Sequence, residues 1–118
     1  MTCCHADFAF TDSSDRAFTI GMPTFTFGAG CLSEAGDQAL TRIRAFAPTA
    51  LVVALGLDAS ESDPLQGLKV TSAGFHAMAA KIASLSLPTV LVQEGGYLSD
   101  DLGRNLVQFL SGFEKARR

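Results

Sequence analysis

The sequence is poor in several residue types that identify common classes of small protein. It has no tryptophan, one tyrosine and three cysteines in 118 residues. Three cysteines are too few, and odd in number, for the disulfide framework that stabilises many small secreted domains. The first ten residues also lack the basic and apolar regions of a signal peptide. We therefore expect a reducing, cytoplasmic setting.

Charged residues and long apolar runs are scarce as well. Asp, Glu, Lys and Arg make up 18% of the chain, whereas about 25% is usual in soluble domains. The net charge is −3 and no basic run is visible, which argues against nucleic acid and anionic membranes as partners. The longest apolar stretches, residues 49–57 and 87–92, are far too short to span a bilayer. We expect partners of neither kind.

Apolar residues, in contrast, are abundant. They make up 47% of the chain, and the mean hydropathy is +0.25. A single small domain normally leaves much of its surface polar, because its core is limited by its size. The excess therefore has two explanations: either the chain is buried against itself or a partner, or it belongs to a larger core.

From Ser33 onward, helical and strand patterns alternate. The expected order is helix 33–47, strand 49–58, helix 70–86, strand 89–93 and helix 99–118. Both strands are continuous apolar runs without alternation, which is typical of parallel sheets covered on both faces. We therefore expect an α/β fold, an open parallel sheet flanked by helices. Residues 1–32 are expected to be irregular, with at most one or two short strands in residues 16–27.

Two polar loops come after the predicted strands. They are "GLDASESDP" (residues 56–64) and "EGGYLSD" (residues 94–100). Functional groups in open α/β sheets lie beyond the carboxyl ends of the strands. We therefore expect the two loops to meet at one rim of the sheet.

Each loop contains a candidate functional residue with two interpretations. Asp58 is a possible hard ligand for a divalent metal, or a loop cap satisfied by backbone N–H groups. Tyr97 can donate a hydrogen bond to a developing oxyanion, or it packs against the rim with its hydroxyl in water. Gly95 and Gly96 allow the backbone to come close to another group. Asp63, which precedes a proline, is interpreted as a turn former.

The residues of the two loops and their flanks resemble a known family. "LVVALGLDASESDPLQGLKVTSAGF" and "LPTVLVQEGGYLSDDLGRNLVQFLSGFE" are similar to the zinc-dependent histone deacetylase superfamily, closest to its bacterial acetylpolyamine amidohydrolases. The resemblance covers residues 35–114, through a G-x-D-x4-D-P loop and, further along the chain, "EGGY". It implies that residues 33–118 are the C-terminal part of an arginase/deacetylase-type fold. Residues 1–32 show no clear match.

The resemblance also implies roles for individual residues. Asp58 corresponds to a zinc ligand, and Tyr97 to the residue that polarises the amide carbonyl and stabilises the oxyanion. Gly95 and Gly96 correspond to glycines that shape the substrate rim. The implied reaction is Zn²⁺-dependent hydrolysis of the N-acetyl amides of polyamines or acetyl-lysine.

The chain departs from the family where the other zinc ligands and the catalytic base are expected. The family uses an Asp-x-His segment and a His-His pair, and neither occurs here. Because a catalytic zinc needs about three protein ligands, we expect a C-terminal fragment that is inactive alone. Its expected partners are an acetylated substrate in the complete enzyme and either the missing N-terminal half or further copies of itself. The alternative is a non-catalytic module that associates with itself or a full-length relative through an open sheet edge.

Overall fold

The chain forms two small sheets and three helices. The computed structural model describes residues 9–13, 17–21, 29–65 and 68–118, with side chains described from Gly36 onward. The elements in chain order are β1 (Ala9–Ser13), β2 (Ala17–Gly21), α1 (Ala29–Phe46), β3 (Leu51–Gly56), the short 3-10 helix η1 (Leu57–Ala59), α2 (Ser72–Ala83), β4 (Thr89–Glu94) and α3 (Asp100–Ala116). Strands β1 and β2 form an antiparallel hairpin, whereas β3 and β4 pair in parallel.

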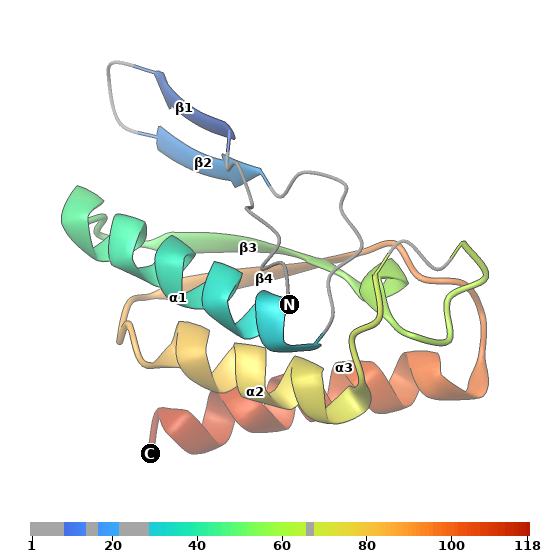
Figure 1. Cartoon of the computed structure of the whole chain (residues 1–118). Coiled ribbons are helices and arrows are strands. Elements are labelled where there is room, and N and C mark those ends of the chain that lie inside the picture. Colours follow the sequence, from blue (N-terminus) through green and yellow to red (C-terminus); the bar gives the residue numbers. More distant parts are fainter. Residues whose placement is uncertain (1–8, 14–16, 22–28, 66–67) are drawn as a thin grey trace.

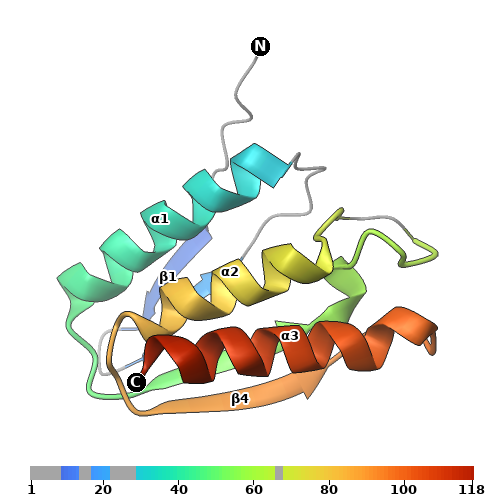
Figure 2. The same ribbon diagram turned by 90° about the horizontal axis from the view of Figure 1, so that it is seen from below.

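The parallel pair and its helices form the body of the molecule. Helix α2 connects β3 to β4, as parallel strands require a crossover. Figures 1 and 2 show α2 and α3 side by side on one face of this sheet, with α1 beside α2. The alternating order of helices and parallel strands predicted from the sequence is therefore confirmed.

The core lies between the parallel sheet and the two helices. It is built from Leu55, Leu57, Val70, Phe75, Ala79 and Phe109. Phe75 and Phe109 are the largest of its side chains, and at most 1% of either is exposed. Removing an apolar side chain of this size from water contributes about 1.5–3 kcal/mol. The face of α2 that carries Phe75 and Ala79 is thus the one that packs against the sheet.

The start of one helix differs clearly from expectation, whereas the other two lie within two residues of it. Helix α1 begins at Ala29 rather than at the predicted Ser33. Extending a helix by one turn is easier than nucleating one. Ser99 does occupy the N-cap of α3, but its side chain makes no capping hydrogen bond. The N-terminal segment expected to be irregular contributes β1 and β2, and its other residues up to 28 lie outside the described part of the chain.

The second face of the parallel sheet does not have the cover expected from its apolar strands. Val52, Val90 and Val92 are 71%, 59% and 41% exposed. Among the described segments, α2 and α3 therefore cover one face only. Within those segments, no helix has both the length and the apolar character needed to cross a bilayer.

Close packing of α2 against α3 depends on a glycine. Gly112 of α3 is buried, and a Cβ added there would lie within 3.0 Å of both the Cα and the carbonyl carbon of His76 on α2. The carbonyl oxygen of His76 would lie nearer still. The obstacle is backbone, which cannot rotate away as a side-chain end can. The two helices therefore approach to a distance that only glycine permits.

We expect Gly112→Ala to lower the free energy of unfolding by about 1–3 kcal/mol, because the added methyl group forces α2 and α3 apart. Gly103→Ala is the matched control, since Gly103 lies on the same helix with no atom near its added Cβ. That variant is expected to gain about 0.5–1 kcal/mol from helix propensity. Urea denaturation monitored by circular dichroism measures both. Equal effects of the two substitutions would contradict the packing argument.

Candidate functional site

The carboxylate of Asp58 lies where the two parallel strands end. Strand β3 ends at Gly56, and η1 then carries Asp58 back toward the sheet. A Cβ added at Gly56 or at Gly95 would lie 2.6 Å from the Asp58 Oδ1 atom. The carboxylate thus rests in a cradle between the last residue of β3 and the first residue after β4. The expectation that the two loops meet at one rim is confirmed.

The Gly95-Gly96 pair makes the turn out of β4. Both residues have positive φ, 52° at Gly95 and 104° at Gly96, a region that residues with a Cβ rarely adopt. A Cβ at Gly96 would also lie 2.6 Å from Leu102 Cδ1 and 3.0 Å from Leu57 Cβ. The turn therefore requires glycine for its backbone geometry and for its close approach to the core.

The polar environment of Asp58 does not support the capping interpretation. Asp58 is exposed, and in the part of the chain with described side chains it accepts no hydrogen bond from a backbone N–H group. Its carboxylate is therefore open to a ligand from solvent. The described residues contain no group of three His, Cys, Asp or Glu side chains that could hold a metal ion. They do not fit a complete zinc site, which needs about three protein ligands.

Tyr97 lies at the same rim, beside the loop that comes after η1. It is 55% exposed and lines a shallow hollow together with Ser60, Asp63, Leu98 and Ser99. Asp58 is not among the residues lining that hollow. The structure thus brings Asp58 to Gly95, and Tyr97 to the loop of residues 60–64. The tyrosine ring is half accessible, as both interpretations of its role require.

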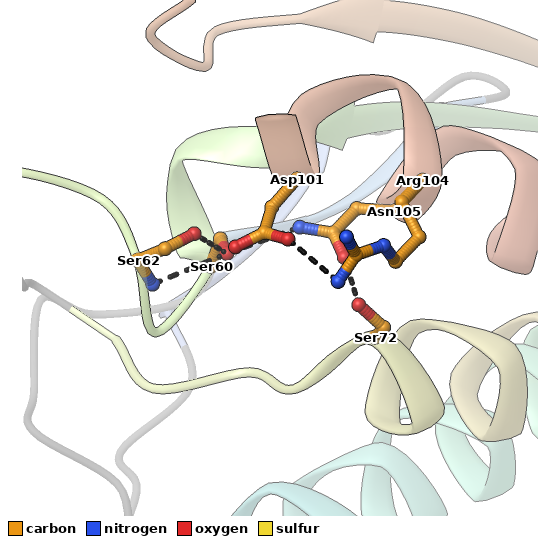
Figure 3. Close-up of polar contacts among 6 residues, drawn as sticks. All are labelled: Ser60, Ser62, Ser72, Asp101, Arg104 and Asn105. Carbon is orange, nitrogen blue, oxygen red and sulfur yellow. Dashed lines mark hydrogen bonds and ion pairs between the residues drawn. The ribbon is translucent and has the colours of Figure 1, made fainter. Parts of the chain in front are cut away.

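A buried polar cluster joins this rim to the helices (Figure 3). Asn105 of α3 is 2% exposed. Its side-chain amide donates a hydrogen bond to Ser60 Oγ at 3.0 Å, and its carbonyl accepts one from Ser72 Oγ at 2.5 Å. The hydroxyls of Ser60 and Ser62 are also 2.9 Å apart. One asparagine therefore ties the loop after Asp58 to the starts of both α2 and α3.

Sequence reasoning missed Asn105, although one signal was present. It lies between Leu102 and Phe109 on the apolar face of α3, where a polar residue must find a partner or lose stability. The interpretation of Asp63 as a turn former is confirmed, since its carboxylate accepts a hydrogen bond from the Leu65 N–H at 2.9 Å. Asp63 is also 6% exposed. The loop after Asp58 is thus stabilised by the hydrogen bond between Asn105 and Ser60 and by the turn at Asp63.

Comparison with known proteins gives a consistent result. A family model described as the histone deacetylase domain matches residues 11–113, beginning nearer the N-terminus than the stretch that carries the sequence resemblance. Acetylpolyamine amidohydrolase 1 of Pseudomonas aeruginosa is 42% identical over 86 residues, which are 73% of this chain and 25% of that protein. Acetylpolyamine amidohydrolase of Burkholderia pseudomallei is 45% identical over 84 residues, 71% of this chain and 25% of that protein.

A solved structure shares the fold. The crystal structure of acetylpolyamine aminohydrolase from Burkholderia pseudomallei matches 84% of this chain and 29% of its own, with a TM-score of 0.76 and 38% identity. The α/β architecture is therefore of the arginase/deacetylase type, as expected. The chain spans about a quarter of the length of the curated relatives it matches.

Alanine substitutions at Gly56 and Gly95 distinguish the effect of crowding against Asp58 from the effect of backbone strain on the free energy of unfolding. Both added Cβ atoms meet the end of the Asp58 side chain, which can rotate away, so Gly56→Ala is expected to change the free energy of unfolding by less than about 0.5 kcal/mol. Gly95→Ala also forces an alanine to φ near 52°, which costs about 1–2 kcal/mol. Urea denaturation gives both values. The difference should persist when Asp58 is replaced by alanine; equal losses in the two glycine variants would show that the turn can relax.

Proposed function

Because the chain belongs to the histone deacetylase domain family, we propose that it supplies part of the active site of a zinc-dependent amidohydrolase that removes acetyl groups from amines. One observation carries the proposal. The Asp58 carboxylate lies against Gly95 at the ends of β3 and β4. Gly95 in turn is two residues before Tyr97 in the chain. An accessible carboxylate and a phenol at one rim are the two chemical groups that this part of the family is expected to contribute.

Asp58 is proposed to be the metal ligand of this segment. The family is generally zinc-dependent, and bound zinc activates a water molecule for attack on an amide. An unpaired carboxylate oxygen is an acceptable ligand for zinc. Asp58 supplies one ligand of the set, and the remaining ligands must come from residues beyond those described. The cradle of Gly56 and Gly95 leaves room for the carboxylate without adding a competing hydrogen bond.

Tyr97 is proposed to be the catalytic hydrogen-bond donor. Its hydroxyl is an O–H donor that can bind the carbonyl oxygen of the acetyl group and stabilise the negative charge that develops there on attack. Gly95 and Gly96 leave the rim beside it free of side chains. Beneath the turn, Leu57 and Leu102 lie so close to Gly96 that a side chain at this position would meet them.

The charge of the rim supports an amine as the substrate. Four acidic residues of the two loops are exposed: Asp58, Glu61, Glu94 and Asp100. Neither loop contains a lysine or an arginine. A surface of one sign attracts ligands of the other, and a partly acetylated polyamine keeps positive charge on its free amines. We propose acetylated polyamines, with acetyl-lysine as the related alternative.

The chain by itself is proposed to lack activity. One carboxylate does not retain zinc at useful affinity, and the described residues place no imidazole at the rim that could act as the general base. A non-catalytic role, in which the chain only binds a partner, is the alternative. The two roles give different results after assembly: the first gives turnover once the other ligands are present, and the second gives binding alone.

We expect the purified chain to contain no stoichiometric zinc and to release no acetate from acetylputrescine or an acetyl-lysine peptide. Adding the part of the Burkholderia pseudomallei amidohydrolase that lies outside the match should produce zinc-dependent turnover. In that assembly Tyr97→Phe should lower kcat about 10²–10³-fold, because one oxyanion donor is lost. Metal analysis and an acetate assay measure these outcomes.

Two results would count against the proposal. Bound zinc and release of acetate by the chain alone would contradict the proposal that the chain by itself is inactive. An assembled complex that releases no acetate would support the non-catalytic role instead.

A further inference from the structure

Ser60 joins the two parts of the loop that comes after β3. Its backbone N–H donates a hydrogen bond to the Leu57 carbonyl and closes η1, the short helix that carries Asp58. Its own carbonyl accepts a hydrogen bond from the Asp63 N–H at 3.0 Å, which shapes the loop of residues 60–64. Only 6% of Ser60 is exposed. A displacement of Ser60 would therefore move η1 and the following loop together.

The side chain of Ser60 is anchored to α3 by one hydrogen bond. Asn105 Nδ2 donates to Ser60 Oγ at 3.0 Å, while Asn105 Oδ1 accepts from Ser72 Oγ at 2.5 Å (Figure 3). Because Asn105 is 2% exposed, bulk water does not replace either bond in the folded chain. The amide of Asn105 therefore determines where Ser60 lies relative to α3.

Ser60 and Asn105 are the buried lining residues of the hollow that Tyr97 also lines. Tyr97 lies three residues before α3 begins at Asp100. Among the residues with described side chains, none forms a hydrogen bond with the Tyr97 hydroxyl. The orientation of the ring therefore depends on the packing around the hollow, of which the loop of residues 60–64 forms one side.

We propose that Asn105 is a positioning residue for Tyr97. By holding Ser60, it keeps the loop of residues 60–64 beside the tyrosine ring and limits the orientations that the ring can adopt. The consequence for catalysis rests on the proposed function, in which the Tyr97 hydroxyl donates a hydrogen bond to the acetyl carbonyl. Such a donor contributes less to the rate when it leaves the productive orientation. Asn105 is itself too buried to meet a substrate, and it acts through Ser60.

The composition of the chain provides a direct readout of this residue. Tyr97 is the only tyrosine and there is no tryptophan, so the tyrosine fluorescence of the folded chain comes from Tyr97 alone. Ser60→Ala removes the hydrogen bond on the side of the hollow, and Ser72→Ala removes the other hydrogen bond of the same amide. Ser72 does not line the hollow. The two variants lose the same hydroxyl group on opposite sides of Asn105.

Quenching of this fluorescence by acrylamide measures access to the ring in the folded chain. Ser60→Ala and Asn105→Ala are expected to raise the quenching constant because the loop beside the ring is released locally. The rise is at most about 1.8-fold, the ratio of complete exposure to the present 55%. Ser72→Ala should leave the constant unchanged. The double variant of Ser60 and Asn105 should not exceed the larger single effect, since both changes remove one contact.

A purely structural role of Asn105 gives a different pattern. It would lower the urea midpoint of all three variants and leave the quenching of the folded chains as it is. Unchanged quenching in Ser60→Ala, or an equal rise in Ser60→Ala and Ser72→Ala, would overturn the proposal. These two serine variants decide the question even if Asn105→Ala does not fold.

Activity of the assembled complex separates this inference from the proposed function. Ser60→Ala is expected to lower kcat about tenfold with little change in KM, a smaller loss than that of Tyr97→Phe. In the Tyr97→Phe background it should lower kcat no further, because it acts through Tyr97. An unchanged kcat in a variant whose quenching rises would overturn the consequence for catalysis. A complex that releases no acetate would count against the function, while the quenching result still decides the positioning role.

Discussion

The parallel register of β3 and β4 is the constraint on which the rest of the structure depends. It pairs Gly56 with Glu94, so both loops leave the sheet at the same level. A shift by one residue would turn every side chain of one strand to the opposite face. Leu55 would then leave the core, and the Asp58 carboxylate would lose its cradle against Gly95. The same hydrogen-bonded ladder thus determines the core and the candidate site.

Packing between the helices and the sheet stabilises the arrangement of the two loops. Gly112 allows α3 to pack directly on the backbone of α2, and Phe75 and Phe109 fill the space between them and the sheet. Asn105 adds a directional link, because its amide binds the loop after Asp58 and the first turn of α2 at once. A buried amide with both of its polar ends satisfied specifies one arrangement, since any other leaves them unpaired.

Local patterns in the sequence were sufficient to predict the helices and strands. They were insufficient to predict the contacts between these elements. The apolar runs around Val53 and Leu91 predicted both strands, and the polar stretches after them predicted where the loops lie. Asn105 was not found, because its partner Ser60 lies 45 residues away in the chain and no local pattern reports such a pairing. The role of Gly56 was missed for a similar reason, since it depends on where the side chain of Asp58 folds back. The apolar strands also implied cover on both faces, and they carry no information on whether that cover belongs to the same chain.

The link through Asn105 has a consequence for motion. Helix α3 starts directly after the loop of Tyr97, and its Asn105 is hydrogen-bonded both to Ser60, in the loop of Asp58, and to Ser72, at the start of α2. Gly112 and Asn105 contact α2 at points about two turns apart along α3, so a tilt of one helix against the other would disturb both contacts. Such a tilt would strain the hydrogen bonds of Asn105 to Ser60 and to Ser72 at the same time. One side chain of α3 thus couples the loop of Asp58 to the helix that starts beside Tyr97.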